Sequence, residues 1–434
     1  MNLSQAYKNY KNSLPHYQKL YDYYLGKNKI INRQLPDPQK PNNKVSTLYG
    51  KSIVETVVGF FASVPVTIMS EDEDYLKQIK QINFLNEADD VNAEQVKLFT
   101  LFGKSYELYW LDNGGKIRFK QYSPLDFHVE TNVDGDILFA IQPYEVTEEG
   151  KKVIKMRVFT ENMIYNFKSY DKGNTFFPDD AVEDIEHYFK DVPVTIFKNN
   201  EEETSDIEPF ITMIDGIDVL LSDSLNSVEA FVNAYLVLAG VEGTDYEDLK
   251  RMKQDGVLLL SNSNDAKWLT KSSDAEFQKL LYETLENMIH EQSGTPKLTS
   301  EKFSSNMSSQ AIKFHLFSLI QKSNVKERKM SKALRRRIRM ITTMLNNHGG
   351  EYDHSNITFQ FSRNIPSDES AITDQIVKLH NIVPVDTLLS WHPRIENVEL
   401  EMNKLLSESD TDNLDGDFTK MINDYIAAQE GAEQ

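Results

Sequence analysis

The order of elements between Asp206 and Met344 constrains the fold of this chain more than any other feature. Apolar residues recur at helical spacing from Pro209 to Gly240, so the sequence predicts a helix of 32 residues, roughly 48 Å long. A compact insert with strand patterns follows, then a second amphipathic helix, a loop rich in small polar residues, and a third, basic helix. Long helices with narrow apolar stripes pack against neighbouring helices. We therefore expect part of an assembly that builds a wall or channel by self-association.

The N-terminal half shows the two-residue periodicity of antiparallel strands. The segments SYELYWL and KIRFKQY flank Asp112–Gly115, a turn sequence that favours positive φ. Two further pairs follow, DFHVET with ILFAIQPY and KVIKMRVFT with MIYNFKSY. Before these pairs the sequence predicts a tyrosine-rich helical arm that breaks at Gly26, a proline-punctuated linker at 35–43, and helices over 45–62, 74–84 and 92–102. The predicted fold class is therefore α+β, built on antiparallel hairpins.

Composition excludes several classes of protein. The 434 residues are enough for two or three domains, and 40% of them are hydrophobic, which is typical of globular proteins. No apolar run approaches the length of a membrane span, and the first residues lack the apolar core of a signal peptide. The chain holds no cysteine, which excludes disulfides and cysteine nucleophiles and fits synthesis in a reducing cytoplasm.

Charge is distributed in blocks of opposite sign. The formal net charge is −20, which argues against a protein that coats nucleic acid. Residues 179–208 hold 11 acids against two lysines, a net −9, and residues 407–434 hold 8 acids against Lys420, a net −7. Residues 311–347 hold 10 basic residues against Glu327, a net +9. Such blocks indicate subunits that meet in a fixed order, although each block alone also fits a solvated face.

The sequence shows no arrangement typical of an enzyme. The nine histidines are scattered, and no pair has the helical spacing of a zinc hydrolase. Phosphate-binding glycine loops and the G-x-S-x-G nucleophile turn are missing. The aspartates from Asp410 to Asp417 are arranged somewhat like a calcium loop, but Leu414 stands at a ligand position and no glutamate closes the loop. We therefore predict no catalytic residue, no metal site and no cofactor.

The segment KERKMSKALRRRIRM is the one dense basic cluster, and two interpretations of it stay open. On a helix, Lys322, Lys326, Lys329 and Arg336 share a face. This face could contact a phosphate backbone. It could instead pair with acids of an adjacent copy, such as the loop Glu201–Asp206, and the acidic total favours this second interpretation. The candidate residues for either role are Lys326, Lys329, Arg335, Arg336, Arg337 and Arg339.

Four collinear stretches resemble the portal proteins of tailed double-stranded DNA bacteriophages, the head-to-tail connectors. YDYYLGKNKI with KPNNKVSTLYGKSIVETVVGFFASVPV is similar to the N-terminal wing entry of that family. EAFVNAYLVLAG resembles the end of its first stem helix. DAKWLTKSSDAEFQKLLYETLENMIHEQSGTPKLTSEKF resembles the clip exit, second stem helix and tunnel loop, and VPVDTLLSWHPRIENVELEMNKLLSE the crown helices. The likeness covers nearly the whole chain, and the tail beyond Ser407 matches no part of it.

The resemblance implies a portal fold with an α+β wing and helical stem and crown. It places these parts in the chain as follows: the wing at 1–204, the first stem helix at 205–241, the clip at 242–273, the second stem helix at 274–292, the tunnel loop at 293–309, a long wing helix and returning strand at 310–366, the crown at 367–406, and an acidic tail at 407–434.

The resemblance also implies a structural role with no enzymatic activity. The family forms a ring, usually of twelve subunits, at one capsid vertex of the virion, after synthesis in the bacterial cytoplasm. Double-stranded DNA passes through the ring, which meets the terminase large subunit, the head-completion adaptor, and the major capsid and scaffold proteins, but no membrane. A scaffold or adaptor of the capsid is one alternative, and a nucleic-acid-modifying enzyme is another. A scaffold should be mostly helical, and an enzyme should show DNA-dependent turnover.

Within this implied architecture, two segments carry the candidate contact residues. Lys297 and Lys302, with Thr295 and Thr299, are the tunnel-loop residues expected to face passing DNA. In the clip, Lys250, Arg251, Lys253 and Trp268 are expected to contact the terminase and the adaptor. The clip strands, including Val257–Leu260, are expected to pair with the same segment of neighbouring subunits, because isolated two-stranded units are marginal in water.

Overall fold

A computed structural model describes residues 1–38, 40–148, 150–232, 235–239, 257–260, 267–269, 275–297, 309–363, 369–380 and 382–392, with 395, 398, 401, 402 and 404. The chain divides into two compact units. One contains residues 1–299 and 315–364, and the other contains 300–314 and 365–434. Helices and antiparallel sheets are both extensive, so the predicted α+β class is confirmed.

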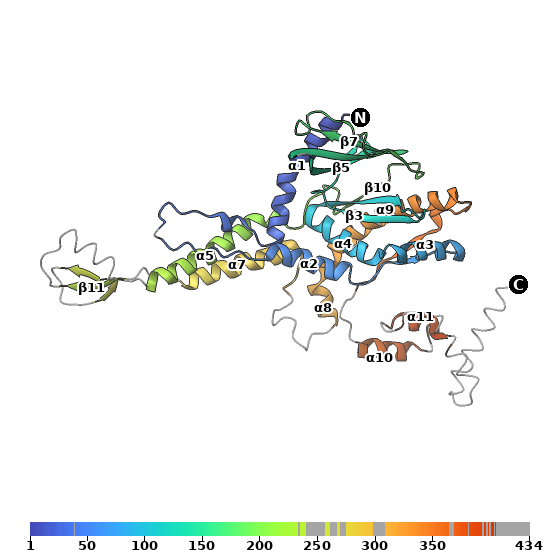
Figure 1. The fold of residues 1–434 in the computed structure, drawn as a ribbon. Coiled ribbons are helices and arrows are strands. Elements are labelled where there is room, and N and C mark those ends of the chain that lie inside the picture. Colours follow the sequence, from blue (N-terminus) through green and yellow to red (C-terminus); the bar gives the residue numbers. More distant parts are fainter. Residues whose placement is uncertain are drawn as a thin grey trace. The chain divides into compact units, whose positions relative to one another are not determined.

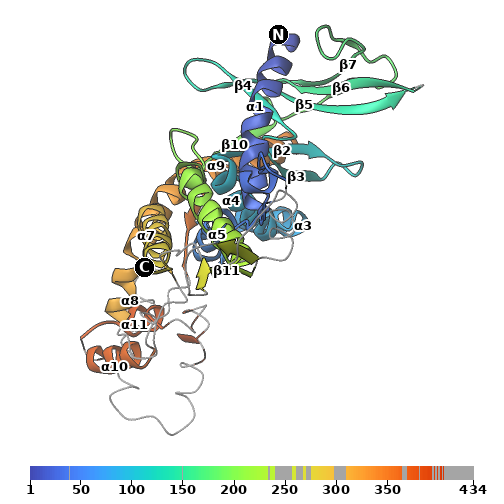
Figure 2. The ribbon, with the colours of Figure 1, turned by 90° about the vertical axis from the view of Figure 1, so that its left-hand side faces the viewer.

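The first unit begins with four helices that the sequence pattern predicted in outline. They are α1 (Leu3–Tyr24), α2 (Tyr49–Phe61), α3 (Glu73–Leu85) and α4 (Ala88–Phe102), with a short 3-10 turn η1 (Lys29–Asn32) after α1. Figure 1 and Figure 2 show α1 running from the largest sheet toward α2. Helix α4 ends at Gly103, whose φ is +87°. A Cβ there would lie 1.9 Å from the carbonyl oxygen of Glu203, so only glycine permits this close approach.

The three predicted hairpins are confirmed, and two sheets contain them. Strands β2 (Lys104–Leu111) and β3 (Ile117–Tyr122) join β10 (Val194–Lys198) in the order β10-β2-β3. The larger sheet runs β4-β5-β6-β7-β8, and β9 also pairs with β7. Its strands are β4 (His128–Thr131), β5 (Ile137–Glu148), β6 (Lys151–Phe159), β7 (Met163–Ser169), β8 (Phe177–Pro178) and β9 (Ile185–Glu186).

The basic helix packs across the smaller sheet. The sequence predicted one helix from 311 to 346, and the structure divides it at Leu316 into α8 (Ser309–His315) and α9 (Phe317–Asn347). Helix α9 contacts β10 and buries Met330, Leu334, Ile338 and Ile341 in the core of the first unit. After α9, the 3-10 turn η4 (His354–Asn356) leads to β14 (Thr358–Gln360), which pairs with β1 (Thr67–Met69).

The first long helix is shorter than predicted. After a 3-10 turn η2 (Glu208–Phe210), α5 spans Ile211–Val232, whereas the sequence predicted a helix to residue 240 or 241. The last predicted turns form strand β11 (Tyr235–Ala239), which pairs in parallel with β12 (Val257–Leu260) and antiparallel with β13 (Lys267–Leu269). The segment YLVLA fits either periodicity, since aromatic and β-branched residues favour strands. Backbone hydrogen bonds to β12 and to β13 stabilise the strand conformation of this segment.

The other long elements follow the prediction more closely. Helix α7 (Ala275–Ser293) matches the predicted second stem helix within one residue at each end. In the second unit, α10 (Glu369–Leu379) and α11 (Val385–Ser390) lie within the predicted crown. The acidic tail at 407–434 lies outside the described residues.

A buried ion pair joins α9 to the smaller sheet. The Arg337 guanidinium donates from Nε to Glu107 Oε1 at 2.7 Å and from Nη2 to Oε2 at 2.5 Å. Both side chains are almost fully buried, and the guanidinium lies 4.6 Å from the ring centroid of Phe119. Tyr109 donates its hydroxyl hydrogen to the same carboxylate at 2.5 Å. The opposite charge and the hydrogen bonds therefore compensate each buried charge, as a buried ion pair requires.

We predict that Glu107→Gln lowers the free energy of unfolding of the first unit by about 3–5 kcal/mol, because it leaves the Arg337 charge buried without a carboxylate. Urea denaturation of the purified protein measures this change. Glu145→Gln serves as the control, since Glu145 pairs with Lys152 at 3.6 Å on the exposed surface and should lose less than about 1 kcal/mol. Equal effects of the two substitutions would contradict the assigned role of the buried pair.

Candidate functional site

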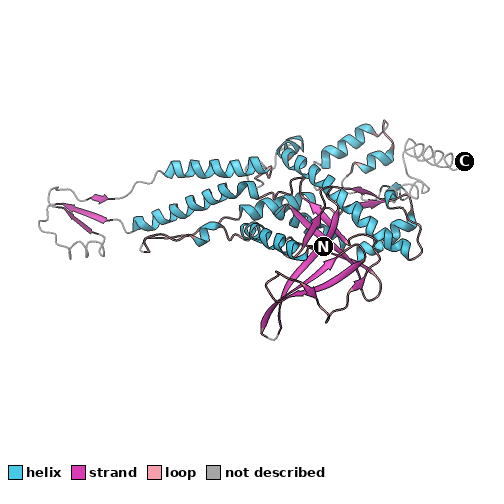
Figure 3. Ribbon diagram, turned by 90° about the horizontal axis from the view of Figure 1, so that it is seen from above, coloured by secondary structure: helices cyan, strands magenta, loops and turns pink. Residues whose placement is uncertain are grey.

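Helices α5 and α7 lie side by side, as Figure 1 and Figure 3 both show. At the N-terminal end of α5 and the C-terminal end of α7, Ile214, Ile217 and Ile289 are buried in one hydrophobic cluster. Further along, apolar side chains remain exposed on both helices. They are Val219, Leu225 and Val228 of α5, and Phe277, Leu280 and Leu281 of α7. The largest exposed fractions are 64% for Val228 and 61% for Leu280, so the described residues leave these two side chains largely uncovered.

The segment between α1 and α2 lies along α5 and is held there by polar contacts. Asp218 is fully buried and accepts from the backbone nitrogen of Thr47 at 2.8 Å and from Asn28 Nδ2 at 2.6 Å. One turn later, Ser222 accepts from the backbone nitrogen of Val45 at 2.9 Å. Two turns later, Asn226 accepts from the backbone nitrogen of Asn43 at 2.7 Å. These contacts explain why α2 begins at Tyr49 and not at the predicted residue 45.

Burial raises the pKa of Asp218, and the hydrogen bonds from Thr47 and Asn28 oppose this shift. At the edge of the same contact, Arg33 pairs with Asp223 at 2.7 Å. In the sequence, the only indication of this arrangement is the spacing of the polar positions 218, 222 and 226, which lie one helical turn apart. Residues 43–47, at and after the end of the predicted linker, thus form a strap along α5.

The start of the predicted tunnel loop is fixed to α7 and α2. Lys297 Nζ pairs with Glu286 Oε2 at 2.6 Å, and the hydroxyl of Tyr49 donates to Glu286 Oε1 at 3.1 Å. Partial burial would raise the pKa of Glu286, but Lys297 and the hydroxyl group hold it below its usual value. The ring of His290 lies 2.8 Å, through Nδ1, from the carbonyl oxygen of Thr295. Lys297 is therefore already neutralised within its own subunit.

Thr295 differs from the sequence-based expectation. Its side chain is almost fully buried, and its hydroxyl group is hydrogen-bonded to that of Ser293. A threonine enclosed in this way does not face passing DNA in the described subunit. The other two tunnel-loop candidates, Thr299 and Lys302, lie outside the described residues.

Asp206 connects the beginning of the stem to the basic helix. Its Oδ2 atom lies 2.9 Å from Lys322 Nζ and 3.0 Å from Lys326 Nζ. Lys322 also donates to the carbonyl oxygen of Ser293 at 3.0 Å, at the C-terminus of α7. Lys326 is almost fully buried, donates to Asn199 Oδ1, and lies 5.5 Å from the ring centroid of Phe99. This cluster links both stem helices to α9.

Most of the remaining candidates on α9 form ion pairs within the described chain, whereas the sequence predicted pairs with an adjacent copy. Lys329 pairs with Glu201. Arg336 and Arg339 both pair with Asp191, at 3.0 Å and 2.8 Å, and Arg336 also donates to the carbonyl oxygen of Val194. The loop Glu201–Asp206, expected as a partner from an adjacent copy, pairs with this helix within the same chain. Helix α9 packs directly on β10, so the basic side chains on its inner face contact the neighbouring loop of the same chain. Arg335 alone among the arginine candidates is exposed without an ion pair in the described part of the chain.

The clip candidates cannot be placed with side chains. Lys250, Arg251 and Lys253 lie outside the described residues, and Trp268 is described only as part of the β13 backbone. The described strands pair with β11 of the same chain. The expectation that they pair with neighbouring subunits therefore stays a prediction.

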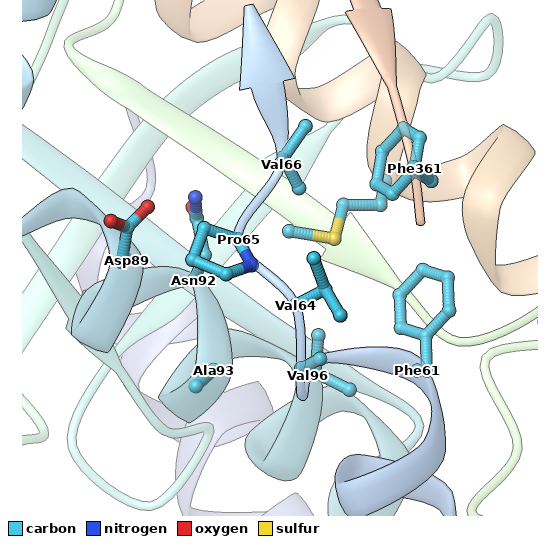
Figure 4. A pocket seen from close by; sticks show the side chains of 11 residues that line it. Phe61, Val64, Pro65, Val66, Asp89, Asn92, Ala93, Val96 and Phe361 are labelled. Carbon is cyan, nitrogen blue, oxygen red and sulfur yellow. The ribbon is translucent and has the colours of Figure 1, made fainter. Parts of the chain in front are cut away.

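The pocket shown in Figure 4 is too small for an ordinary ligand. Figure 4 shows a pocket lined by Phe61, Pro65, Val96 and Phe361, and its volume is about 20 Å³, far below the size of usual ligand sites. Among the described residues, no group of three or more carboxylates and histidines is placed to hold a metal ion. None of the described helices is long and apolar enough to cross a membrane.

Comparisons with known proteins point in one direction. The family model "Phage portal protein, SPP1 Gp6-like" matches residues 3–414. A portal protein of Bacillus phage SPP1 is 22% identical over 403 residues, which cover 87% of this chain and 78% of that protein. A portal protein of Clostridium phage phiCD119 is 22% identical over 421 residues, which cover 89% and 90% of the two chains.

Solved structures with a similar arrangement come from gene transfer agent particles. One chain, from the neck of an empty particle, is 12% identical with a TM-score of 0.43 and covers 83% of this chain and 90% of its own length. Another, from the virion of a native particle, is 11% identical with a TM-score of 0.41 and covers 77% and 85%.

The buried lysine of the Asp206 cluster gives a prediction about pH. Burial lowers the pKa of Lys326 to about 8 from its ordinary 10.5, although Asp206 opposes the shift. The unfolded chain therefore binds more protons than the folded chain between these two pH values, and this contribution to the free energy of unfolding rises with pH in that window. The difference in unfolding free energy between wild type and Lys326→Met should grow by about 1–3 kcal/mol from pH 8 to pH 10. A difference that does not change with pH would contradict the burial of a charged lysine.

Proposed function

The chain belongs to the SPP1 Gp6-like family of phage portal proteins, and from this premise we propose that it forms a ring at one vertex of the capsid. Double-stranded DNA passes through the central channel of this ring during packaging and ejection. A separate ATPase, the terminase large subunit, drives the DNA inward. The chain itself supplies the channel wall and the docking platform, and we assign it no catalytic step.

The observation that carries this proposal is the uncovered apolar face of α5 and α7. Among the described residues, large apolar side chains are exposed on α5 at Val219, Leu225 and Val228 and on α7 at Leu280 and Leu281, although residues 43–47 contact the polar positions of α5. Exposed apolar surface of this extent marks a protein interface. In a ring the contact is heterologous, so this apolar surface of one subunit packs against a different surface of the next, and the contact repeats around the circle. At roughly 25 cal/mol per Å² of apolar area, repeated burial of this kind supplies a large share of the association energy.

Charge supports the use of the ring as a DNA channel. The chain carries a net charge of −20, and most of the α9 bases that could hold phosphates are neutralised by carboxylates of the same subunit. A wall with an acidic surplus repels phosphate and lets DNA slide, whereas an unpaired basic wall would retain it. Lys297 lies near the start of the predicted tunnel loop and Lys302 near its middle, and these two cations are expected to meet passing phosphates.

We further propose that the clip at 242–273 faces out of the capsid. It then contacts the terminase during packaging and the head-completion adaptor afterwards, through Lys250, Arg251, Lys253 and Trp268. The described strands β11, β12 and β13 support a compact unit at this place in the chain. The three wing hairpins argue against the alternative of a mostly helical scaffold.

The stem face gives the first test of this function. The double substitution Leu225→Glu/Leu280→Glu should convert rings to smaller species, because it places two carboxylates per subunit into an apolar interface. Mass photometry at micromolar protein measures the size distribution. Val133→Glu is the matched control, since Val133 is fully exposed in the turn between β4 and β5 and should leave rings unchanged. Rings that form equally in both variants would overturn the assignment of this face.

The tunnel loop gives the second test. Lys297→Ala/Lys302→Ala should leave rings intact and lower DNA packaging or retention several-fold, because the cations nearest the channel are lost. Lys297→Ala alone should have a smaller effect, since Glu286 already neutralises that lysine. The control is Lys279→Ala, which removes an exposed lysine from α7 outside the loop. If the double variant packages DNA as well as wild type does, these lysines are not the phosphate contacts.

A further inference from the structure

A row of cations stands exposed on the outer side of α9, opposite its buried ion pairs. Arg328, Lys332, Arg335 and Arg339 follow each other at spacings of four, three and four residues, so they share one helical face. All four side chains are exposed. Arg339 pairs with Asp191, whereas the other three have no ion pair with any described residue. This face is distinct from the inward face that the sequence singled out.

A broad groove borders this row. Its walls are α9, β10, the turn between β4 and β5, and the segment from η4 to β14, and its volume is about 1030 Å³. Lys332 and Arg335 line it together with the paired cations Lys329, Arg336 and Arg339. The carboxylates of Asp191 and Glu201 in the same groove are already occupied by those cations. With Lys198 included, six cations and four carboxylates line the groove, so its lining carries a net charge of +2.

The distribution of paired and unpaired charges along the chain indicates the chemistry of the partner. Five of the eleven acids in residues 179–208 already form ion pairs within the first unit: Asp179, Asp191, Glu201, Glu203 and Asp206. The other strongly acidic block, residues 407–434, holds eight acids against one lysine. The cations left over on α9 and the acids of this second block are thus complementary in sign. The groove also holds the carboxylates of Asp134 and Asp136 in the turn between β4 and β5, so the contact should lie on the α9 side, where the free cations stand.

We propose that the groove between α9 and β10 binds the acidic segment 407–434 of a copy of this chain. Carboxylates of the segment pair with Lys332 and Arg335, and Arg328 extends the contact along the helix. Where the tether spans the distance, it raises the effective concentration of the segment at the groove, so a weak contact suffices. This proposal depends on the proposed ring in one respect only: a ring would let the segment come from a neighbouring subunit as well as from the same one.

The lack of cysteine in the chain permits a direct test in the full-length protein. In the variant Thr358→Cys/Thr411→Cys, one cysteine stands at an exposed position that lines the groove, and the other stands within the acidic segment. A short bismaleimide should link the two cysteines. Adding Lys332→Glu/Arg335→Glu should lower the yield at least fivefold, and so should about 1 M salt, at which the Debye length is about 3 Å. Lys8→Glu/Lys11→Glu, the same charge change on α1, should leave the yield unchanged.

Further arms separate the outcomes. A mixture of the two single-cysteine proteins gives a link only if the segment comes from another copy, and mass photometry of the same samples reports ring formation independently. A link that persists unchanged after charge reversal, or no link at all, would overturn the proposal. So would a charge reversal that abolishes duplex retention without any link, which assigns the groove to nucleic acid. Loss of rings without any link would instead assign it to a folded face of a neighbouring subunit.

Discussion

The attachment of α9 to the wing by buried and half-buried ion pairs determines how the rest of this molecule is arranged. Asp206 holds Lys322 and Lys326, Glu107 holds Arg337, and Asp191 holds Arg336 and Arg339 along successive turns of one helix. Removing charges from water is costly, so such pairs persist only where geometry and further hydrogen bonds compensate them. Here carbonyl oxygens, Asn199 and Tyr109 complete the arrangement. The rotation of α9 about its axis is thereby fixed, which leaves one row of cations facing outward.

The same cluster ties the stem to the wing. Asp206 stands just before α5, and Lys322 reaches the carbonyl oxygen of Ser293 at the end of α7, so both stem helices are held at their wing ends. The strap of residues 43–47, together with Asn28, adds a ladder of polar contacts along α5. Rigid, polar fixation at the wing contrasts with the exposed apolar side chains further along the stem. This contrast is what a subunit needs if its stem must present a fixed face to identical neighbours.

Much of the fold could be predicted from local patterns, and much of the pairing could not. The hairpin at Asp112–Gly115 follows from turn chemistry, and α7 follows from its apolar spacing. The segment Tyr235–Ala239 was misassigned because aromatic and aliphatic residues suit both periodicities until a partner strand decides. The basic run indicated ion pairs, but which side of the helix faces the protein depends on long-range packing. Thr295 illustrates the same limit, since a polar residue in a loop-like sequence is enclosed by Ser293 and His290.

The central claim is that this subunit is incomplete alone and closes into a ring through its stem. Electron cryo-microscopy of the purified wild-type protein tests it most directly, across a range of salt concentrations because the chain carries a net charge of −20. The account predicts closed rings with a central hole in which α5 and α7 of each subunit pack on those of the next. A folded monomer at micromolar concentration that assembles at no salt concentration would contradict it, as would rings whose stem helices stay uncovered.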